Sequence, residues 1–192
     1  MNLKCAFYSE PHLNIQFALA AAIGTQASTY YTVAEVKKHE LYKKSSRPEF
    51  SDYDIAVIRI NGRFTFGSNV QPIPLATQAP PTGALAVLVG WGRTINVGSK
   101  LRAVSVPIVS QDKCRRFYIN RDEGEVTPRM LCAGVLSGDF STCAGDDGSP
   151  LVYNRAQVGV LFWEMGCGRA DSPPVYANVA VFRDWIRKNT GV

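Results

Sequence analysis

The stretch Gln157–Trp163 reads QVGVLFW, and every residue after Gln157 is apolar or glycine. A short apolar run without alternating polar residues predicts a strand that is buried on both faces. Asp54–Ile60, DIAVIRI, has the same character nearer the N-terminus. Because strands buried on both faces are typical of closed β-barrels, the two runs favour a barrel fold.

Further short runs rich in Val, Ile, Tyr and Phe recur between turn signals, as in an all-β protein. Strands are therefore also expected at Tyr30–Val36, Ala84–Gly92, Ala103–Val109, Ser149–Tyr153 and Pro174–Val179. The exception is the segment Val181–Asn189, VFRDWIRKN. Its Phe182, Trp185 and Ile186 have the i, i+3, i+4 spacing of an amphipathic helix, which we expect to end at Gly191.

Composition and charge exclude several classes of protein. The 192 residues are 46% hydrophobic and 19% charged, which suits one globular domain or two small joined ones. The net charge is +5, but the basic residues are scattered in pairs and no basic run alternates with aromatic residues. We therefore expect no nucleic-acid partner and interpret the charge as solvated surface, with a polyanion-binding face as the alternative. No apolar run approaches the about 20 residues that span a bilayer, so no membrane partner is expected.

The cysteines and histidines show no metal-ligand pattern. One of the five cysteines, Cys5, stands alone near the start of the chain. The other four lie in the C-terminal half: Cys114, Cys132, Cys143 and Cys167. No C-x-x-C pair occurs, and His12 and His39 lack metal-ligand spacing, so we expect no metal and no cofactor. Two disulfides and one unpaired thiol suit an oxidising compartment.

Several motifs follow one another in a familiar order. They are DIAVIRI (Asp54–Ile60), GWG (Gly90–Gly92), MLCAG (Met130–Gly134), STCAGDDGSP (Ser141–Pro150), VGVLFWEMGCG (Val158–Gly168), PPVYANV (Pro173–Val179) and a terminal DWI. From about Cys5 to the end, their order and approximate spacing resemble the trypsin-like serine proteases of peptidase family S1. The resemblance implies an all-β, two-barrel chymotrypsin-like fold with a C-terminal α-helix and the active site between the barrels. It also implies disulfides that join Cys114 to Cys132 and Cys143 to Cys167.

The resemblance also predicts the domain organisation. We expect a single peptidase domain over residues 1–192, with a partial N-terminal barrel over 1–80 and a C-terminal barrel and helix over 81–192. The family's activation segment and first strands have no counterpart here, so the first barrel is predicted to be incomplete. The family partner of Cys5 and the amine that would pair with Asp146 are then missing as well. Either another segment covers the open strand edges, or the sequence is an incomplete version of a longer protein, and whether Met1 is the native start stays open.

The catalytic positions of the family can be compared one residue at a time. The family uses a serine nucleophile, a histidine base and a buried aspartate that orients the histidine. Asp54 matches the aspartate, but Asp147 stands at the serine position and Lys4 stands near the histidine position. His12 and His39 match no catalytic position. No competent catalytic site is therefore expected.

An aspartate is a poor replacement for this nucleophile. Gly145 belongs to the relic of the oxyanion hole, where backbone N–H groups stabilise negative charge. A carboxylate of Asp147 would compete for these donors. At ~4 Å and an effective dielectric of about 20 it would repel an oxyanion by roughly 4 kcal/mol, about a thousandfold in rate. An acyl-aspartate would also be an anhydride, which is much harder to form than an ester.

The specificity pocket also departs from the family pattern. Ser141 stands where trypsin-like members carry an aspartate for Arg or Lys, so a neutral pocket is expected. Phe162, Trp163 and Glu164 replace the pattern S-W-G, and Pro174 replaces a usual glycine. We expect the pocket to be closed. Because a buried carboxylate without a partner is costly, we expect Glu164 to point outward across the cleft.

These departures predict a non-catalytic serine protease homolog. Such homologs regulate or act as decoys in extracellular protease systems, so we expect a secreted protein with a protease, substrate or inhibitor as its protein partner. No clear signal peptide supports secretion, because Ile15–Ile23, IQFALAAAI, follows a long segment that contains Glu10. Two alternatives stay open: a weak or residual serine-type endopeptidase, and a truncated product without function.

Overall fold

The computed structural model of the chain describes residues 17–18, 30–42, 51–68, 70–90, 102–119, 124–137, 146–165 and 172–192. The strands in these ranges are β1 (Phe17–Ala18), β2 (Tyr30–Tyr31), β3 (Val33–Lys38), β4 (Ala56–Ile60), β5 (Leu85–Gly90), β6 (Arg102–Val109), β7 (Met130–Ala133), β8 (Pro150–Tyr153), β9 (Ala156–Trp163) and β10 (Val175–Asn178). The helices are α1 (Gln111–Ile119) and α2 (Val179–Thr190). The expected all-β fold with a C-terminal helix is confirmed.

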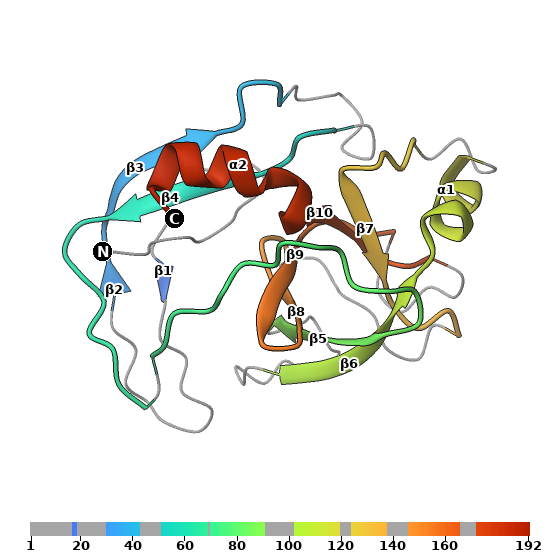
Figure 1. The fold of residues 1–192 in the computed structure, drawn as a ribbon, viewed down its shortest axis with the longest axis horizontal. Coiled ribbons are helices and arrows are strands. Elements are labelled where there is room, and N and C mark those ends of the chain that lie inside the picture. The colour runs from blue at the N-terminus through green and yellow to red at the C-terminus, as the bar shows by residue number, and fades with distance from the viewer. Residues whose placement is uncertain are drawn as a thin grey trace.

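Six antiparallel strands close into a barrel in the order β10–β7–β6–β5–β8–β9 (Figure 1). β9 holds the apolar run at Gln157–Trp163 and is buried at every position except its two end residues. On its two sides it pairs with β8 and with β10. All strands of the barrel follow Pro81, while the division of the chain at residue 80 stays a prediction.

Gly159 in β9 is required by the packing inside this barrel. A Cβ at this position would lie 2.9 Å from Cβ of Tyr176 and 3.3 Å from Cβ of Leu151. Real Cβ atoms are essentially never found as close as the first of these distances. The glycine therefore lets β8 and β10 approach β9 closely, which explains an interruption in an otherwise bulky run.

The described residues before the barrel form two-stranded sheets. β1 pairs with β2, and β3 pairs with β4 in an antiparallel sheet. β4, from the run Asp54–Ile60, is buried at all positions except Arg59, whereas most of β3 is exposed. In this part of the chain the described strands therefore make a partial sheet, and one closed barrel follows it.

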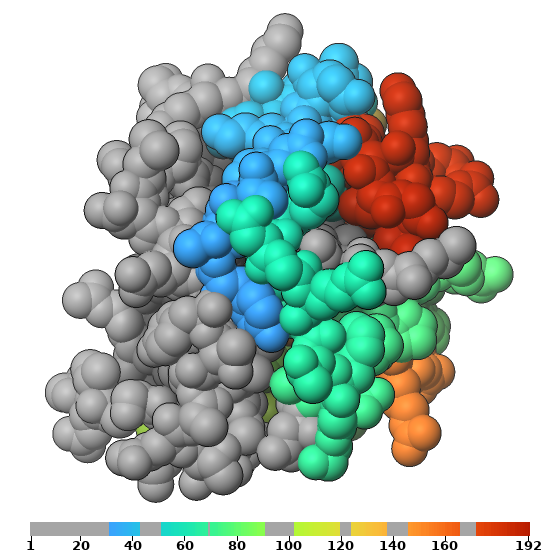
Figure 2. Space-filling view, turned by 90° about the vertical axis from the view of Figure 1, so that its left-hand side faces the viewer, coloured from blue at the N-terminus to red at the C-terminus, as the bar shows by residue number. Residues whose placement is uncertain are grey.

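The helix α2 lies across the β3–β4 sheet and ends the chain (Figure 1). It begins at Asn178, whose side-chain oxygen accepts a hydrogen bond from the N–H of Ala180 at 3.2 Å. It ends at Gly191, which has φ of 82° and donates its N–H to the carbonyl of Arg187. Figure 2 shows the surface of α2 beside the surfaces of β3 and of the segment 51–68. The predicted helix is confirmed and is slightly longer than expected.

The helix α1 and the strand β7 were not predicted. Most of α1 is polar, and among its residues only Cys114 and Tyr118 are buried, one turn apart. Ser110 accepts a hydrogen bond from the N–H of Lys113 at 3.3 Å, as expected at a helix start. Cys114 forms a disulfide with Cys132 of β7, which confirms the first expected pairing. Cys5, Cys143 and Cys167 lie outside the described residues.

Neither helix in the described part of the chain is long and apolar enough to cross a membrane. No group of three or more His, Cys, Asp or Glu side chains among these residues is placed to hold a metal ion.

Candidate functional site

The two family positions that the structure describes lie on separate segments. Asp54 is half-buried and lies in the loop directly before β4. Asp147 lies in the turn directly before β8. The expected relics Lys4, Ser141 and Gly145 lie outside the described residues. The structure therefore describes the residues expected at the aspartate and nucleophile positions, whereas Lys4, expected near the histidine position, lies outside the described residues.

The turn that carries Asp147 is fixed by backbone hydrogen bonds to β9. The N–H of Gly148 donates to the carbonyl of Leu161 at 2.7 Å, and the N–H of Leu161 donates to the carbonyl of Ser149 at 2.9 Å. The N–H of Ser149 also closes the turn onto the carbonyl of Asp146 at 2.9 Å. The turn is thus held against a buried strand of the barrel, so residue 147 has a defined position.

Asp146 is buried beneath this turn, with an exposed fraction of 5%. Its side chain lies against Gly90, where a Cβ would come within 2.5 Å of Asp146 Oδ1 and 3.1 Å of Ser149 Oγ. Gly90 is the first residue of the GWG motif. That glycine is therefore needed for the buried carboxyl group of Asp146 to fit against β5.

The surroundings of Asp147 disfavour negative charge. The pKa of Asp147 is raised, mainly because its carboxyl group is partly buried. The neighbouring carboxyl group of Asp146 raises it further. The residue as a whole is nevertheless exposed to solvent. The charged form of the Asp147 carboxyl group is therefore less favoured here than in water.

The expected pocket-wall residues are packed into the barrel. Phe162 is buried in the hydrophobic core. The ring centroid of Trp163 lies 4.3 Å from the ring centroid of Tyr118. Tyr118 donates its hydroxyl to the carbonyl of Pro173 at 2.5 Å, which ties α1 to the segment before β10. Pro174 is buried, and its Cδ would lie 2.8 Å from a Cβ at Gly134.

The prediction that Glu164 points outward is wrong. Its Oε2 atom is buried, although part of the residue is exposed. The carboxyl groups of Glu164 and Asp146 add to the effect of burial and raise the pKa of the enclosed Tyr176 hydroxyl. Part of the Glu164 carboxyl group therefore lies inside the protein, close enough to the Tyr176 hydroxyl to act on its pKa.

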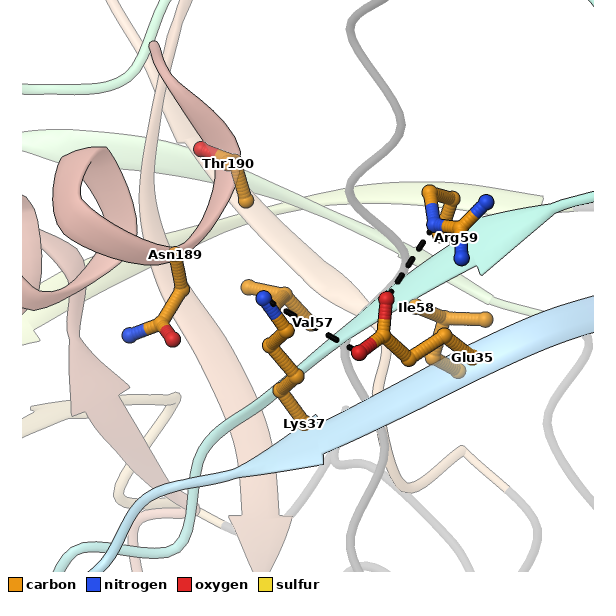
Figure 3. A pocket seen from close by; sticks show the side chains of 7 residues that line it. All are labelled: Glu35, Lys37, Val57, Ile58, Arg59, Asn189 and Thr190. Atoms are coloured by element: carbon orange, nitrogen blue, oxygen red, sulfur yellow. Dashed lines mark hydrogen bonds and ion pairs between the residues drawn. The ribbon is translucent and has the colours of Figure 1, made fainter.

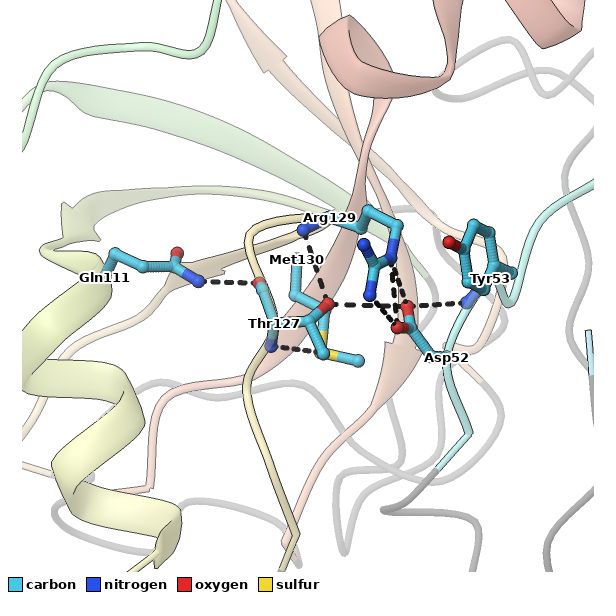
Figure 4. Close-up of polar contacts among 6 residues, drawn as sticks. All are labelled: Asp52, Tyr53, Gln111, Thr127, Arg129 and Met130. Carbon is cyan, nitrogen blue, oxygen red and sulfur yellow. Dashed lines mark hydrogen bonds and ion pairs between the residues drawn. The ribbon is translucent and has the colours of Figure 1, made fainter. Parts of the chain in front are cut away.

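The loop before Asp54 is held by a polar network that was not predicted (Figure 4). The guanidinium of Arg129 donates from Nε to Asp52 Oδ2 at 3.0 Å, and Nη2 donates to the same oxygen. Thr127 Oγ1 lies 3.4 Å from Asp52 Oδ1, and Gln111 at the start of α1 donates to the Thr127 carbonyl at 2.6 Å. The hydrogen bonds to Asp52 raise the pKa of Arg129. This network joins the segment before β4 to α1 and to the start of β7.

Tyr53 connects this network to Asp54. It has φ of 58°, in the left-handed region that a tyrosine rarely adopts. Its ring lies under the guanidinium of Arg129, with 4.5 Å from the Arg129 Cζ atom to the ring centroid. Its other neighbour is His39, whose ring centroid lies 4.7 Å away. The backbone at Tyr53, directly before Asp54, is therefore strained. The side chains of Arg129 and His39 hold the Tyr53 ring in place.

A surface pocket lies away from all these residues, between the β3–β4 sheet and the end of α2 (Figure 3). Its cavity volume is about 150 Å³, and Glu35, Lys37, Val57, Ile58, Arg59, Asn189 and Thr190 line it. Glu35 lies 3.2 Å from Arg59 and 3.9 Å from Lys37, so one carboxylate is shared by two cations. None of the candidate site residues named in the sequence analysis lines this pocket, although Val57, Ile58 and Arg59 belong to the run Asp54–Ile60.

The chain was compared with known families, proteins and structures. A sequence model of the family described as trypsin matches residues 10–186. The chain is 35% identical over 184 residues to Trypsin 5G1 of Aedes aegypti, which covers 93% of this chain and 67% of that protein. It is 31% identical to Trypsin-2 of Salmo salar, which covers 95% of this chain and 91% of that protein. Among solved structures, it resembles neuropsin, a serine protease expressed in the limbic system of mouse brain, with a TM-score of 0.76 and 33% identity. That match covers 85% of this chain and 73% of neuropsin.

Proposed function

The chain belongs to the trypsin family of serine proteases, and on this premise we propose that it is a non-catalytic member that acts by binding another protein. The observation that carries the proposal is the aspartate at position 147, where the family has its nucleophilic serine. Without that hydroxyl group, the chain lacks the serine nucleophile of the family at the position that the turn before β8 presents.

Two further observations support the loss of catalysis. Lys4 stands near the position of the general base, and the surroundings of Asp147 disfavour the negative charge that a carboxylate nucleophile needs. Loss of the triad in another serine protease lowers turnover by about a millionfold. A chain with Asp54 alone of the triad is therefore expected to have no useful hydrolytic rate.

The proposed partner is a protein of an extracellular protease system: a protease, a substrate or an inhibitor. Such a partner could bind the folded protein without being cleaved, so that binding does not require the missing serine nucleophile. The disulfide between Cys114 and Cys132 supports an oxidising, secreted setting.

A residual endopeptidase is the second candidate, because the relatives described above are named trypsins. A serine-directed fluorophosphonate distinguishes the two candidates. The proposed non-catalytic protein stays unlabelled and hydrolyses a peptide ester no faster than buffer. Labelling of any serine in the folded chain, or turnover that Asp147→Ala abolishes, would establish an enzyme and contradict the proposal.

The binding role needs its own measurement. An active trypsin is assayed on a peptide ester with and without a protein inhibitor, and the purified chain is added in increasing amounts. A regulator or decoy changes the trypsin rate or the inhibitor concentration needed for half inhibition. A denatured, refolding-blocked sample of the same chain is the control. If the folded chain leaves both quantities unchanged, the proposal of a partner among proteases and inhibitors fails.

A further inference from the structure

His39 lies in a cage of aromatic rings between three segments. Its ring centroid lies 4.7 Å from that of Tyr53 in the loop before β4. From α2, Trp185 stacks on the imidazole at 5.0 Å with an interplanar angle of 25°, and Phe182 meets its edge at 5.5 Å. Only 10% of the His39 side chain is exposed. The imidazole thus joins the end of β3, the loop that leads to Asp54 and the C-terminal helix.

The hydrogen bonds in this cage require a neutral imidazole. The backbone N–H of Leu41 donates to His39 Nδ1 at 3.2 Å, so Nδ1 acts as the acceptor. A proton on Nδ1 would place two donors against each other and break this bond. The backbone N–H of His39 donates to the carbonyl of Ile55 at 3.0 Å, which fixes the ring beside β4.

Charged groups reach the cage from every segment packed against it. Glu40 Oε2 lies 3.6 Å from His39 Nδ1, but it also accepts the indole N–H of Trp185 at 2.6 Å. The charge of Asp52 also acts to raise the pKa of His39, but the Asp52 carboxylate is paired with Arg129. The Arg129 guanidinium lies over the ring of Tyr53. On α2, Lys188 acts on Glu40 and favours its charged form. Both carboxylates near His39 are therefore already occupied by other donors.

Burial outweighs these two carboxylates. Desolvation of the imidazole lowers the pKa of His39 below its ordinary value of 6.5, while Glu40 and Asp52 act in the opposite direction. The native cage therefore binds its proton less readily than the unfolded chain. The cage therefore contributes its full stabilisation at pH values above the pKa that His39 has in the unfolded chain. This stabilisation is lost as the pH falls through the lower pKa that His39 has in the folded protein.

We propose that the cage around His39 is an acid-sensitive clasp that holds α2 on the β3–β4 side of the protein and opens when His39 is protonated. The geometry gives the reason: a proton on Nδ1 removes the bond from Leu41 and puts a charge on an imidazole that is only 10% exposed to solvent. Opening also frees one face of Tyr53, the strained residue next to Asp54. The clasp thus couples acidity to the docking of α2 and to the loop that carries Asp54.

Hydrogen exchange of the α2 amides tests this proposal. Protection factors, corrected for the intrinsic pH dependence of exchange, are measured at about pH 7.5 and about pH 5, with the β9 amides as the internal reference. We expect the protection of α2 to fall severalfold at the lower pH, because the folded cage binds the His39 proton less readily than the opened one, while β9 keeps its protection. His39→Phe keeps an aromatic ring that cannot titrate, so its α2 protection stays the same at both pH values.

His12→Gln is the matched control, because it removes the other histidine of the sequence and changes none of the four rings of the cage. Its α2 protection is expected to fall as in the unchanged chain. With a single histidine left, the same variant also allows the pKa of His39 to be read from an NMR titration. A pKa of 6.5 or above overturns the proposal, and so does an acid-induced loss of α2 protection that persists in His39→Phe. If His39→Phe does not fold, the titration and the exchange data from His12→Gln decide the question.

Discussion

Arg129 and Asp52 form a two-pronged ion pair that fastens the loop before β4 to the start of β7. The two residues are 77 positions apart in the chain and come from the partial sheet side and the barrel side of the molecule. With exposed side-chain fractions of 30% and 24%, the pair is shielded enough to matter for stability. It is also one of the contacts that hold Tyr53 in place before Asp54.

Arg129→Lys is expected to lower the free energy of unfolding by about 1–2 kcal/mol. A lysine keeps the charge but loses the planar fork that bonds both carboxylate oxygens and covers the ring of Tyr53. Urea unfolding followed by circular dichroism measures this change. The matched control is Arg115→Lys at the exposed pair with Glu125, where a change within about 0.5 kcal/mol is expected. Equal losses in both variants would show that the pair with Asp52 has no special role.

Much of the barrel was predictable because its strands are short apolar runs. β5, β6, β8, β9 and β10 lie where the runs predicted them, with bounds that differ by one or two residues. The helix α2 was predictable from the spacing of three apolar residues. α1 was missed because its buried face consists of Cys114 and Tyr118 alone. β7 was quoted as a motif and not as a strand, since four residues carry too weak a pattern for periodicity.

The candidate site was predictable only in part. The assignment of Asp54 and Asp147 to family positions follows from short local motifs and stays a prediction. The network of Asp52 and Arg129 depends on how distant segments meet, and each residue alone resembles ordinary surface charge. The buried position of Glu164 Oε2 depends on how the chain packs after β9, which the sequence does not reveal.

Gly159→Ala is expected to destabilise the protein by about 1–3 kcal/mol. The added methyl group would come within 2.9 Å of Tyr176 Cβ and 3.3 Å of Leu151 Cβ, and both neighbours belong to strands of the closed barrel. Gly67→Ala is the control, because no heavy atom lies within 4 Å of its added methyl group. Thermal unfolding should show a lower Tm for the first variant and little change for the second. A Gly159→Ala protein as stable as the unchanged chain would mean that the barrel relaxes at this position.

Asp147→Asn is expected to raise the stability at neutral pH and to lose this advantage in acid. The pKa of Asp147 is raised in the folded state, so the native state binds its proton more tightly than the unfolded state. The carboxyl group therefore opposes folding once the pH rises above its folded pKa, and it has no such effect below the unfolded value near 3.8. Tm values at about pH 7 and about pH 3 test the sign. Asp112→Asn in the first turn of α1 serves as the control and is expected to give no gain at neutral pH, since a negative charge there suits the helix N-terminus. A loss of stability in Asp147→Asn at neutral pH would contradict the expectation.

Asp147→Ser is expected to remain without measurable turnover, although it restores the hydroxyl group of the family's nucleophile. A serine hydroxyl attacks a carbonyl carbon only when a base takes its proton, and Lys4 stands near the position of that base. The backbone bonds that hold Gly148 and Ser149 against β9 do not involve the side chain at 147, so the turn should keep its shape. Peptide-ester hydrolysis and fluorophosphonate labelling are compared between Asp147→Ser and Asp147→Ala. If the serine variant alone is labelled and turns over, the chain holds a working base that its sequence does not suggest, and the aspartate alone keeps it inactive.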